Sequence, residues 1–316
     1  MPETGPSVVL HFFEDIEIPC IVNHFEFAAA NCDFSVRTVD REFIVEAHGS
    51  EISTNFDIRI QEALRFVLAQ SVDWRVLFYH DGARQQFRLA SAIERSRKAQ
   101  LGRPIDGYQH IQDFWRLFSL YLEYVKRTTP GAGWSRCSYY LHNAREASVN
   151  SVDAWSIGVS VAVEGIANLL DVELPGEERN RLAALRRSVR DFISKQPCFR
   201  GLGDRVNGLL GMLENFRVQD RLRPLIEIGY VDRAYMNAWA ELRNKHVHPG
   251  KFDLGDMAIQ DYHQQLLGLI SKATVLMYHI VFCIIGYKGK FIDYGMLGYP
   301  RKDYPLSVTP PGAARE

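Results

Sequence analysis

The periodicity of the apolar residues changes once along the chain, near residue 105, and this change constrains the fold more than any other feature. Before it, one helix is expected over 55–69, with Asn55 or Asp57 as its N-cap. An Asp81-Gly82 turn is typical of a hairpin. Short runs rich in β-branched and aromatic residues predict strands at 8–13, 34–39, 42–47, 74–79 and 85–89.

From Gly107 onward the apolar periodicity is helical. The basic stretch 91–104, where periodicity lapses, is interpreted as a linker, and the Gly-, Tyr- and Pro-rich chain from 287 predicts an irregular strap. The pattern therefore predicts an α+β chain with a mixed, β-rich N-terminal domain (1–100), an all-α bundle (105–290) and a C-terminal strap and flexible tail (291–316). Helices are expected over 109–126, 152–170, 177–194, 203–215, 222–228, 232–246 and from 255 or 256 to 285.

The composition favours a cytoplasmic location and excludes a uniformly basic nucleic-acid-binding surface. Lys plus Arg is 37 against 38 Asp plus Glu, so any nucleic-acid site must be a local cleft and not a uniformly basic surface. The five cysteines include no Cys-x-x-Cys pair, which favours reduced thiols in a cytoplasm. The N-terminus lacks a signal peptide's basic start and apolar core, and the apolar segment 266–286 is interpreted as a buried core helix. We expect a cytoplasmic protein without a membrane-bound segment.

The end of the 232–246 helix carries the main candidate site. Arg243 offers a planar fork of donors that suits a phosphate, and His248 has an imidazole that exchanges protons near neutral pH. On a straight helix their side chains would point roughly 140° apart. Pro249-Gly250 ends the helix at His248, which would allow the two side chains to converge.

Arg243-Asn244 followed by His248, with four residues between the arginine and the histidine, resembles the Arg-x4–6-His motif of the HEPN superfamily. The resemblance covers about residues 107–290, and Glu164 lies where many such domains carry an acidic residue on a helix. The segment 287–304 after the last helix is similar to the end of HEPN domains in the ApeA-like group of bacterial defence proteins. The resemblance implies a HEPN-like helical bundle, a homodimer and cleavage of RNA, in anti-phage defence or as a toxin.

The implied chemistry needs neither a metal nor another cofactor. The 2′-hydroxyl of RNA attacks the adjacent phosphate, with His248 as acid or base, Arg243 on the phosphate and Asn244 orienting either group. Lys245 and His246 are secondary candidates for RNA contact. A two-fold dimer would bring two arginines and two histidines to one cleft.

Glu164 is expected to hold Arg243 across the bundle, although Arg145 or a backbone donor is an alternative partner for that carboxylate. A phage-derived or antitoxin partner is expected at the N-terminal domain.

Three other interpretations of these residues remain open. The polar run at the helix end is also what compensation of the helix dipole requires. His246-x-His248 with Asp253 or His263 offers zinc ligands, in a spacing that matches no known motif. In the third interpretation the protein is non-catalytic: the helical domain is a dimerisation scaffold and the N-terminal domain binds a regulatory ligand.

Overall fold

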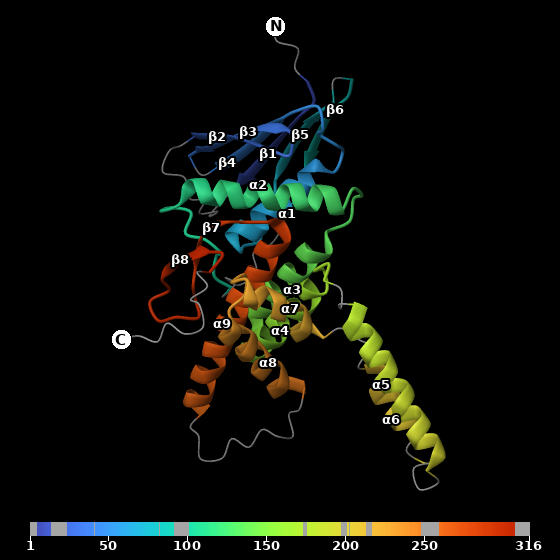
Figure 1. Ribbon diagram of the computed structural model, residues 1–316. Coiled ribbons are helices and arrows are strands. Elements are labelled where there is room, and N and C mark those ends of the chain that lie inside the picture. The colour runs from blue at the N-terminus through green and yellow to red at the C-terminus, as the bar shows by residue number, and fades with distance from the viewer. Residues whose placement is uncertain are drawn as a thin grey trace.

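The computed structural model describes residues 5–13, 24–40, 42–81, 83–91, 101–172, 176–196, 201, 203–212, 217–247 and 259–306. Within them the chain is α+β: an antiparallel sheet lies at one end and helices fill the other (Figure 1). The sheet has the strand order β2-β3-β4-β1-β5-β6. Its strands are β1 (Ser7–Phe13), β2 (His24–Ala29), β3 (Cys32–Val39), β4 (Glu42–His48), β5 (Val76–His80) and β6 (Gln85–Leu89).

Two helices cover the inner face of the sheet, α1 (Phe56–Leu68) and α2 (Ile111–Thr128). Strand alternation aims every second residue of β1 at them, so Val8, Leu10 and Phe12 are buried. Trp115 of α2 stacks on Phe27 of β2 with ring centroids 4.8 Å apart. The change of periodicity near residue 105 was expected to separate the N-terminal domain from the helical bundle. It does not divide the core, because α2 follows this point in the chain and packs on the sheet.

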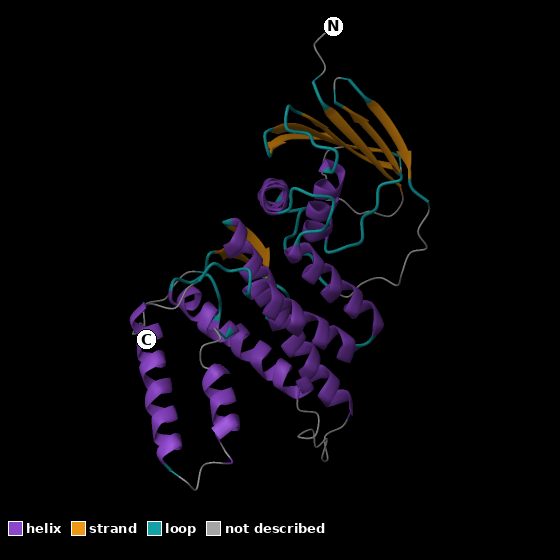
Figure 2. Ribbon diagram, turned by 90° about the vertical axis from the view of Figure 1, so that its right-hand side faces the viewer, coloured by secondary structure: helices purple, strands orange, loops and turns teal. Residues whose placement is uncertain are grey.

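The remaining helices form a bundle below this layer. The long helix α9 is apolar enough over 261–285 to cross a membrane by length and composition, but 67% of its most apolar window is buried inside the protein. It is a core helix, as the sequence predicts. Two views show α5 and α6 projecting from the bundle as a hairpin (Figures 1 and 2). The elements are α3 (Arg136–Asn150), α4 (Val152–Ala167), α5 (Gly176–Lys195), α6 (Gly203–Met212), α7 (Val218–Glu227), α8 (Arg233–Val247) and α9 (Ile259–Ile285).

Several local expectations were wrong or incomplete. Strand β2 and helix α3 were not predicted, and Asn55 stands at the N-cap of α1 without forming a side-chain cap. The end of the expected linker is part of the core, since Leu101 is buried. The expected strap forms a hairpin of β7 (Gly289–Ile292) and β8 (Arg301–Tyr304) against the bundle. The end of the expected tail, 307–316, lies outside the described residues.

His279 of α9 is fully buried under this hairpin. Its ring centroid lies 4.8 Å from that of Phe291 and 5.2 Å from that of Tyr304, and neither ring nitrogen has a hydrogen-bond partner. Burial lowers the pKa of His279 to about 3, and nearby Lys302 acts in the same direction against Asp293. The imidazole is therefore neutral in the folded protein at any pH near neutrality.

The neutral state of His279 makes stability depend on pH. Between pH 6.5 and about 3 the unfolded chain binds a proton that the folded protein does not, so the free energy of unfolding falls as pH decreases through this window. The wild type loses stability between pH 8 and pH 5, and we predict that His279→Leu makes this loss smaller by about 2 kcal/mol.

Urea denaturation at both pH values measures this difference. His263→Gln, a change at an exposed position of the same helix, should retain the wild-type pH dependence. An unchanged pH dependence in His279→Leu would contradict the assignment.

Candidate functional site

The candidate site begins with the position of α4, which α3 fixes through close backbone approach. A Cβ atom added at Gly158 would lie 2.4 Å from Cβ of Ala147, and one at Gly165 would lie 2.4 Å from the ring of Tyr140. Gly158 of α4 lies against Ala147 of α3. Gly165, seven residues later on α4, lies against Tyr140, seven residues earlier on α3. The two helices therefore run antiparallel in contact, which only glycine at these positions allows.

The register of α8 against α4 is set by a buried indole. Nε1 of Trp239 donates to the carbonyl oxygen of Ser160 at 3.1 Å. A buried indole N–H needs an acceptor, so sliding α8 along α4 would leave this donor unpaired. Asp232 starts the helix, accepting from the backbone N–H of Ala234 at 2.7 Å, as the sequence predicts. The side chain of Leu242 continues the buried face.

One turn further along both helices, Arg243 meets Glu164. Nε of Arg243 donates to Oε2 of Glu164 at 3.1 Å, and the sequence separation of 79 equals that of the Trp239–Ser160 contact. Equal separations one turn apart mean that α4 and α8 run in the same direction here. The contact expected between Glu164 and Arg243 is thus present.

This ion pair is open to solvent. The side chains of Arg243 and Glu164 are 42% and 43% exposed. Pairs this exposed contribute about 0–1 kcal/mol to stability. Within the part of the chain that the structure describes, the two terminal amino groups of Arg243 have no hydrogen-bond partner. The pair orients the guanidinium through Nε and does not engage its two terminal amino groups.

The neighbouring candidates are placed differently. Asn244 is exposed on α8. Lys245 forms an ion pair with Glu241, four residues earlier on the same helix, at 3.1 Å. His246 belongs to the helical backbone of α8, but its side chain and all of His248 lie outside the described residues. The structure brings Arg243 and Glu164 together, and the convergence of His248 on them stays a prediction.

Glu164 is half-exposed even though α4 is an apolar helix. Arg145, the alternative partner, contacts Glu146 on α3. Of the alternative zinc ligands, His263 is exposed on α9, and the side chains of the other three lie outside the description.

An exposed apolar stripe adjoins the ion pair on α4. Ile157 and Val161 are 48% and 54% exposed, and with Glu164 they follow a spacing of four and three residues that places them on one helix face. Among the described side chains of α9, the other long apolar helix, there is no large exposed apolar one, so of these two helices α4 alone offers such a face.

The residues that sequence reasoning missed are those that position the site. Ser160 and Gly158 were not singled out, and Trp239 was assigned only to an apolar face. The available signal was the indole N–H of Trp239, which needs a buried acceptor wherever the ring is buried. Which acceptor it finds depends on the tertiary structure.

Comparisons with protein-family models, with curated proteins and with solved structures find no match.

The glycine contact between α3 and α4 yields a matched pair of variants. We predict that Gly158→Ala destabilises the protein by about 1–3 kcal/mol, because Cβ of Ala147 cannot rotate away and the helices must separate. Gly268→Ala on α9, where an added Cβ meets nothing within 4 Å, should instead stabilise by up to about 1 kcal/mol through helix propensity.

Chemical denaturation of both variants shows whether the two substitutions change the free energy of unfolding in opposite directions. Equal stabilisation by the two substitutions would show that α3 and α4 are not in close contact at Gly158.

Proposed function

We propose that this protein is a metal-independent endoribonuclease of the HEPN type that acts in bacterial defence or as a toxin. The observation that carries the proposal is the Arg243–Glu164 pair. A carboxylate from one helix fixes the Nε side of the guanidinium, and no described residue bonds its terminal amino groups in this 42% exposed side chain near the end of α8. That is the arrangement a phosphate-binding arginine needs, since the outer fork makes bidentate contacts with phosphate oxygens.

Stability does not explain the arrangement equally well. An ion pair with both side chains more than two fifths exposed has little stabilising value. Dipole compensation at the end of α8 requires a positive charge, and Lys245 already provides one nearby. Neither the stability of the fold nor compensation of the helix dipole requires a second helix to hold Arg243 in one orientation.

The reaction assigns a role to each residue. The 2′-hydroxyl attacks the phosphorus and the 5′-oxygen leaves, so one proton is removed and one is delivered at different oxygens. His248 carries these protons, Arg243 stabilises the charge on the phosphorane, and Asn244 orients the phosphate or the imidazole. Lys245 and His246 make secondary contacts with RNA. The products are a 2′,3′-cyclic phosphate and a free 5′-hydroxyl.

A homodimer supplies the second proton carrier. One imidazole does not easily serve two oxygens on opposite sides of a phosphate in a single step, whereas two symmetry-related imidazoles do. The exposed stripe of Ile157 and Val161 beside Glu164 supports this arrangement. Two copies packed through α4 about a two-fold axis would cover these apolar side chains and bring both Arg243 side chains to one cleft.

The first test of this function removes the two motif side chains. We predict that Arg243→Ala and His248→Ala each reduce cleavage of total RNA by at least about 100-fold, since a general acid–base group contributes about that much. Arg181→Ala, a change at an exposed arginine of α5, should cleave like the wild type. Cleavage should persist in EDTA, because the nucleophile belongs to the RNA.

Circular dichroism of each variant confirms that the fold is retained. Full activity in both folded motif variants would exclude the assigned site. Activity lost in EDTA and restored by zinc would favour the His246/His248 metal site. An inactive wild type would favour the non-catalytic alternative, in which the helical part is a scaffold and the N-terminal part binds a ligand.

The second test concerns the dimer. We predict that Val161→Glu, which places a charge in the exposed stripe, converts the protein to a monomer and abolishes cleavage while the fold is retained. Arg243→Ala and His248→Ala subunits, each inactive alone, should recover partial activity when mixed, because a mixed dimer holds one arginine and one histidine.

Light scattering gives the oligomeric state, and a fluorescent RNA gives the rate. A wild type that is monomeric at working concentration and cleaves undiminished would contradict the shared cleft.

A further inference from the structure

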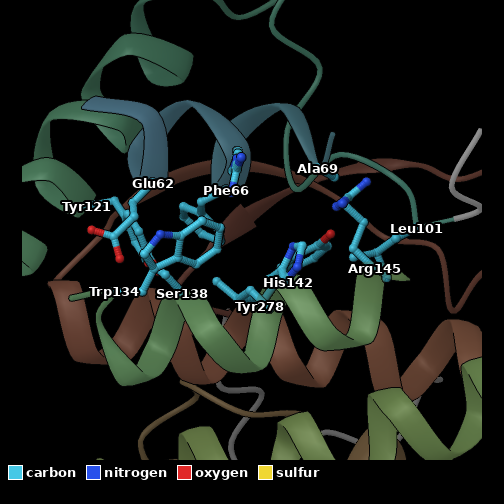
Figure 3. A pocket seen from close by; sticks show the side chains of 12 residues that line it. Glu62, Phe66, Ala69, Leu101, Tyr121, Trp134, Ser138, His142, Arg145 and Tyr278 are labelled. Atoms are coloured by element: carbon cyan, nitrogen blue, oxygen red, sulfur yellow. The ribbon is translucent and has the colours of Figure 1, made fainter. Parts of the chain in front are cut away.

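A pocket lies where the N-terminal layer meets the helical bundle, on the far side of α3 from α4. Helix α1 lies on one side and α3 on the other, and Tyr278 of α9 and Leu101 also line it (Figure 3). Its lining includes Glu62, Arg65, Trp134, His142 and Arg145. The motif that carries the proposed nuclease function contributes nothing to this lining.

Arg145 is the unusual member of the lining. It is only 5% exposed, and its Nη2 atom has no partner in hydrogen-bond geometry, although Oε1 of Glu146 lies against it. Its ion pair is with Glu146, the next residue of α3. Adjacent residues on a helix do not face each other, and the Glu146 side chain is itself 41% exposed, so this contact compensates the buried charge poorly. Burial lowers the pKa of Arg145 to about 10, with Arg65 acting in the same direction.

His142 adds a second unpartnered group, one helical turn before Arg145. Its Nδ1 atom is buried without a hydrogen bond, 3.8 Å from Oε1 of Glu146. Burial lowers the pKa of His142 to about 4, and the charges of Arg145 and Arg65 add to this effect against Asp73. The ring stands edge-on to Trp134 at 5.1 Å. The imidazole of His142 is therefore neutral near pH 7, and the charges of two arginines act on it.

The remaining charges of the lining already have partners. Arg65 of α1 pairs with Asp73 and lies over the Trp134 ring, 4.4 Å from its centroid. Glu62 forms a buried ion pair with Arg59 at 2.7 Å and accepts from the backbone N–H of Ser135 at 2.6 Å. The donors on α3 are compensated least well: Nδ1 of His142 has no hydrogen bond, and Nη2 of Arg145 has only the contact with Glu146. An anion in the pocket would satisfy both.

We propose that this pocket binds the oxyanion group, a carboxylate or a phosphate, of a small molecule. The guanidinium of Arg145 donates to the oxyanion, Nδ1 of His142 contributes a second hydrogen bond, and Trp134 forms the wall beside it. The cavity volume is about 20 Å³, which holds little more than one water-sized group. One oxygen of the oxyanion therefore enters, and the rest of the molecule lies at the open mouth. This site is independent of the proposed nuclease function.

The proposed site predicts how Arg145 affects the stability of the protein when no ligand is bound. A buried charge that lacks a good partner is costly, so replacing it by an apolar side chain of similar length removes the cost. Arg145→Met should therefore raise or preserve the melting temperature of the protein in chloride alone. An arginine with a structural role would lower it on substitution.

The experiment measures melting temperature in potassium acetate and in potassium phosphate, each against potassium chloride at equal ionic strength. We expect at least one of the two anions to raise the wild-type melting temperature by about 2 °C or more, with saturation. Arg145→Met should lose this rise. Arg223→Met, at an arginine of α7 whose side chain is 63% exposed, should keep it. A rise with acetate alone assigns a carboxylate, and one with phosphate alone assigns a phosphate group.

Equal rises in wild type and Arg145→Met, or no saturable rise with either anion, would overturn the proposal. So would a folded Arg145→Met protein that melts well below wild type in chloride. If Arg145→Met does not fold, the ring of His142 in the wild type decides by NMR. A bound oxyanion raises the pKa of His142 from about 4, and a pKa that stays unchanged at saturating anion contradicts the site.

Discussion

The packing of α4 between two neighbours is the constraint on which the candidate site depends. On one side its glycines allow α3 to approach within contact of the backbone, as at Gly158 and Ala147. On the other side the indole of Trp239 fixes α8 through the carbonyl of Ser160. Because both contacts allow one register only, Glu164 and Arg243 meet at the end of α8 without any need for the ion pair to hold the helices together.

The sequence predicted the elements whose periodicity is strong, and it failed where tertiary contacts decide. Helices α1, α4 and α8 lie within a few residues of their expected ranges, because apolar spacing and caps such as Asp232 are local signals. Strand β2 and the β7–β8 hairpin were missed, because their short segments become strands only by pairing with distant partners. The boundary near residue 105 misplaced α2, whose Trp115 packs on the sheet.

The same division applies to the candidate site. The contact of Glu164 with Arg243 followed from the family resemblance, and the structure places the two side chains together. Their half-exposure and the stripe formed by Ile157 and Val161 were not foreseen, because an apolar helix does not reveal which of its faces a neighbour covers. The pocket beside α3 had no sequence signal, since Arg145 and His142 acquire meaning only opposite α1.

Three arginines show how burial and partners separate structural from functional roles. Arg59 is buried against Glu62, whose carboxylate also accepts from the backbone of Ser135, so removing either member would strand a charge in the core. Arg243 is too exposed for its pair to stabilise the fold appreciably, and yet it is held in one orientation. Arg145 is buried with only the adjacent, 41% exposed Glu146 as its ion-pair partner, a cost that packing alone does not offset. The fold itself accounts for the first of these side chains, and the other two are the residues on which our proposals rest: a phosphate of RNA for Arg243, and the oxyanion of a small ligand for Arg145.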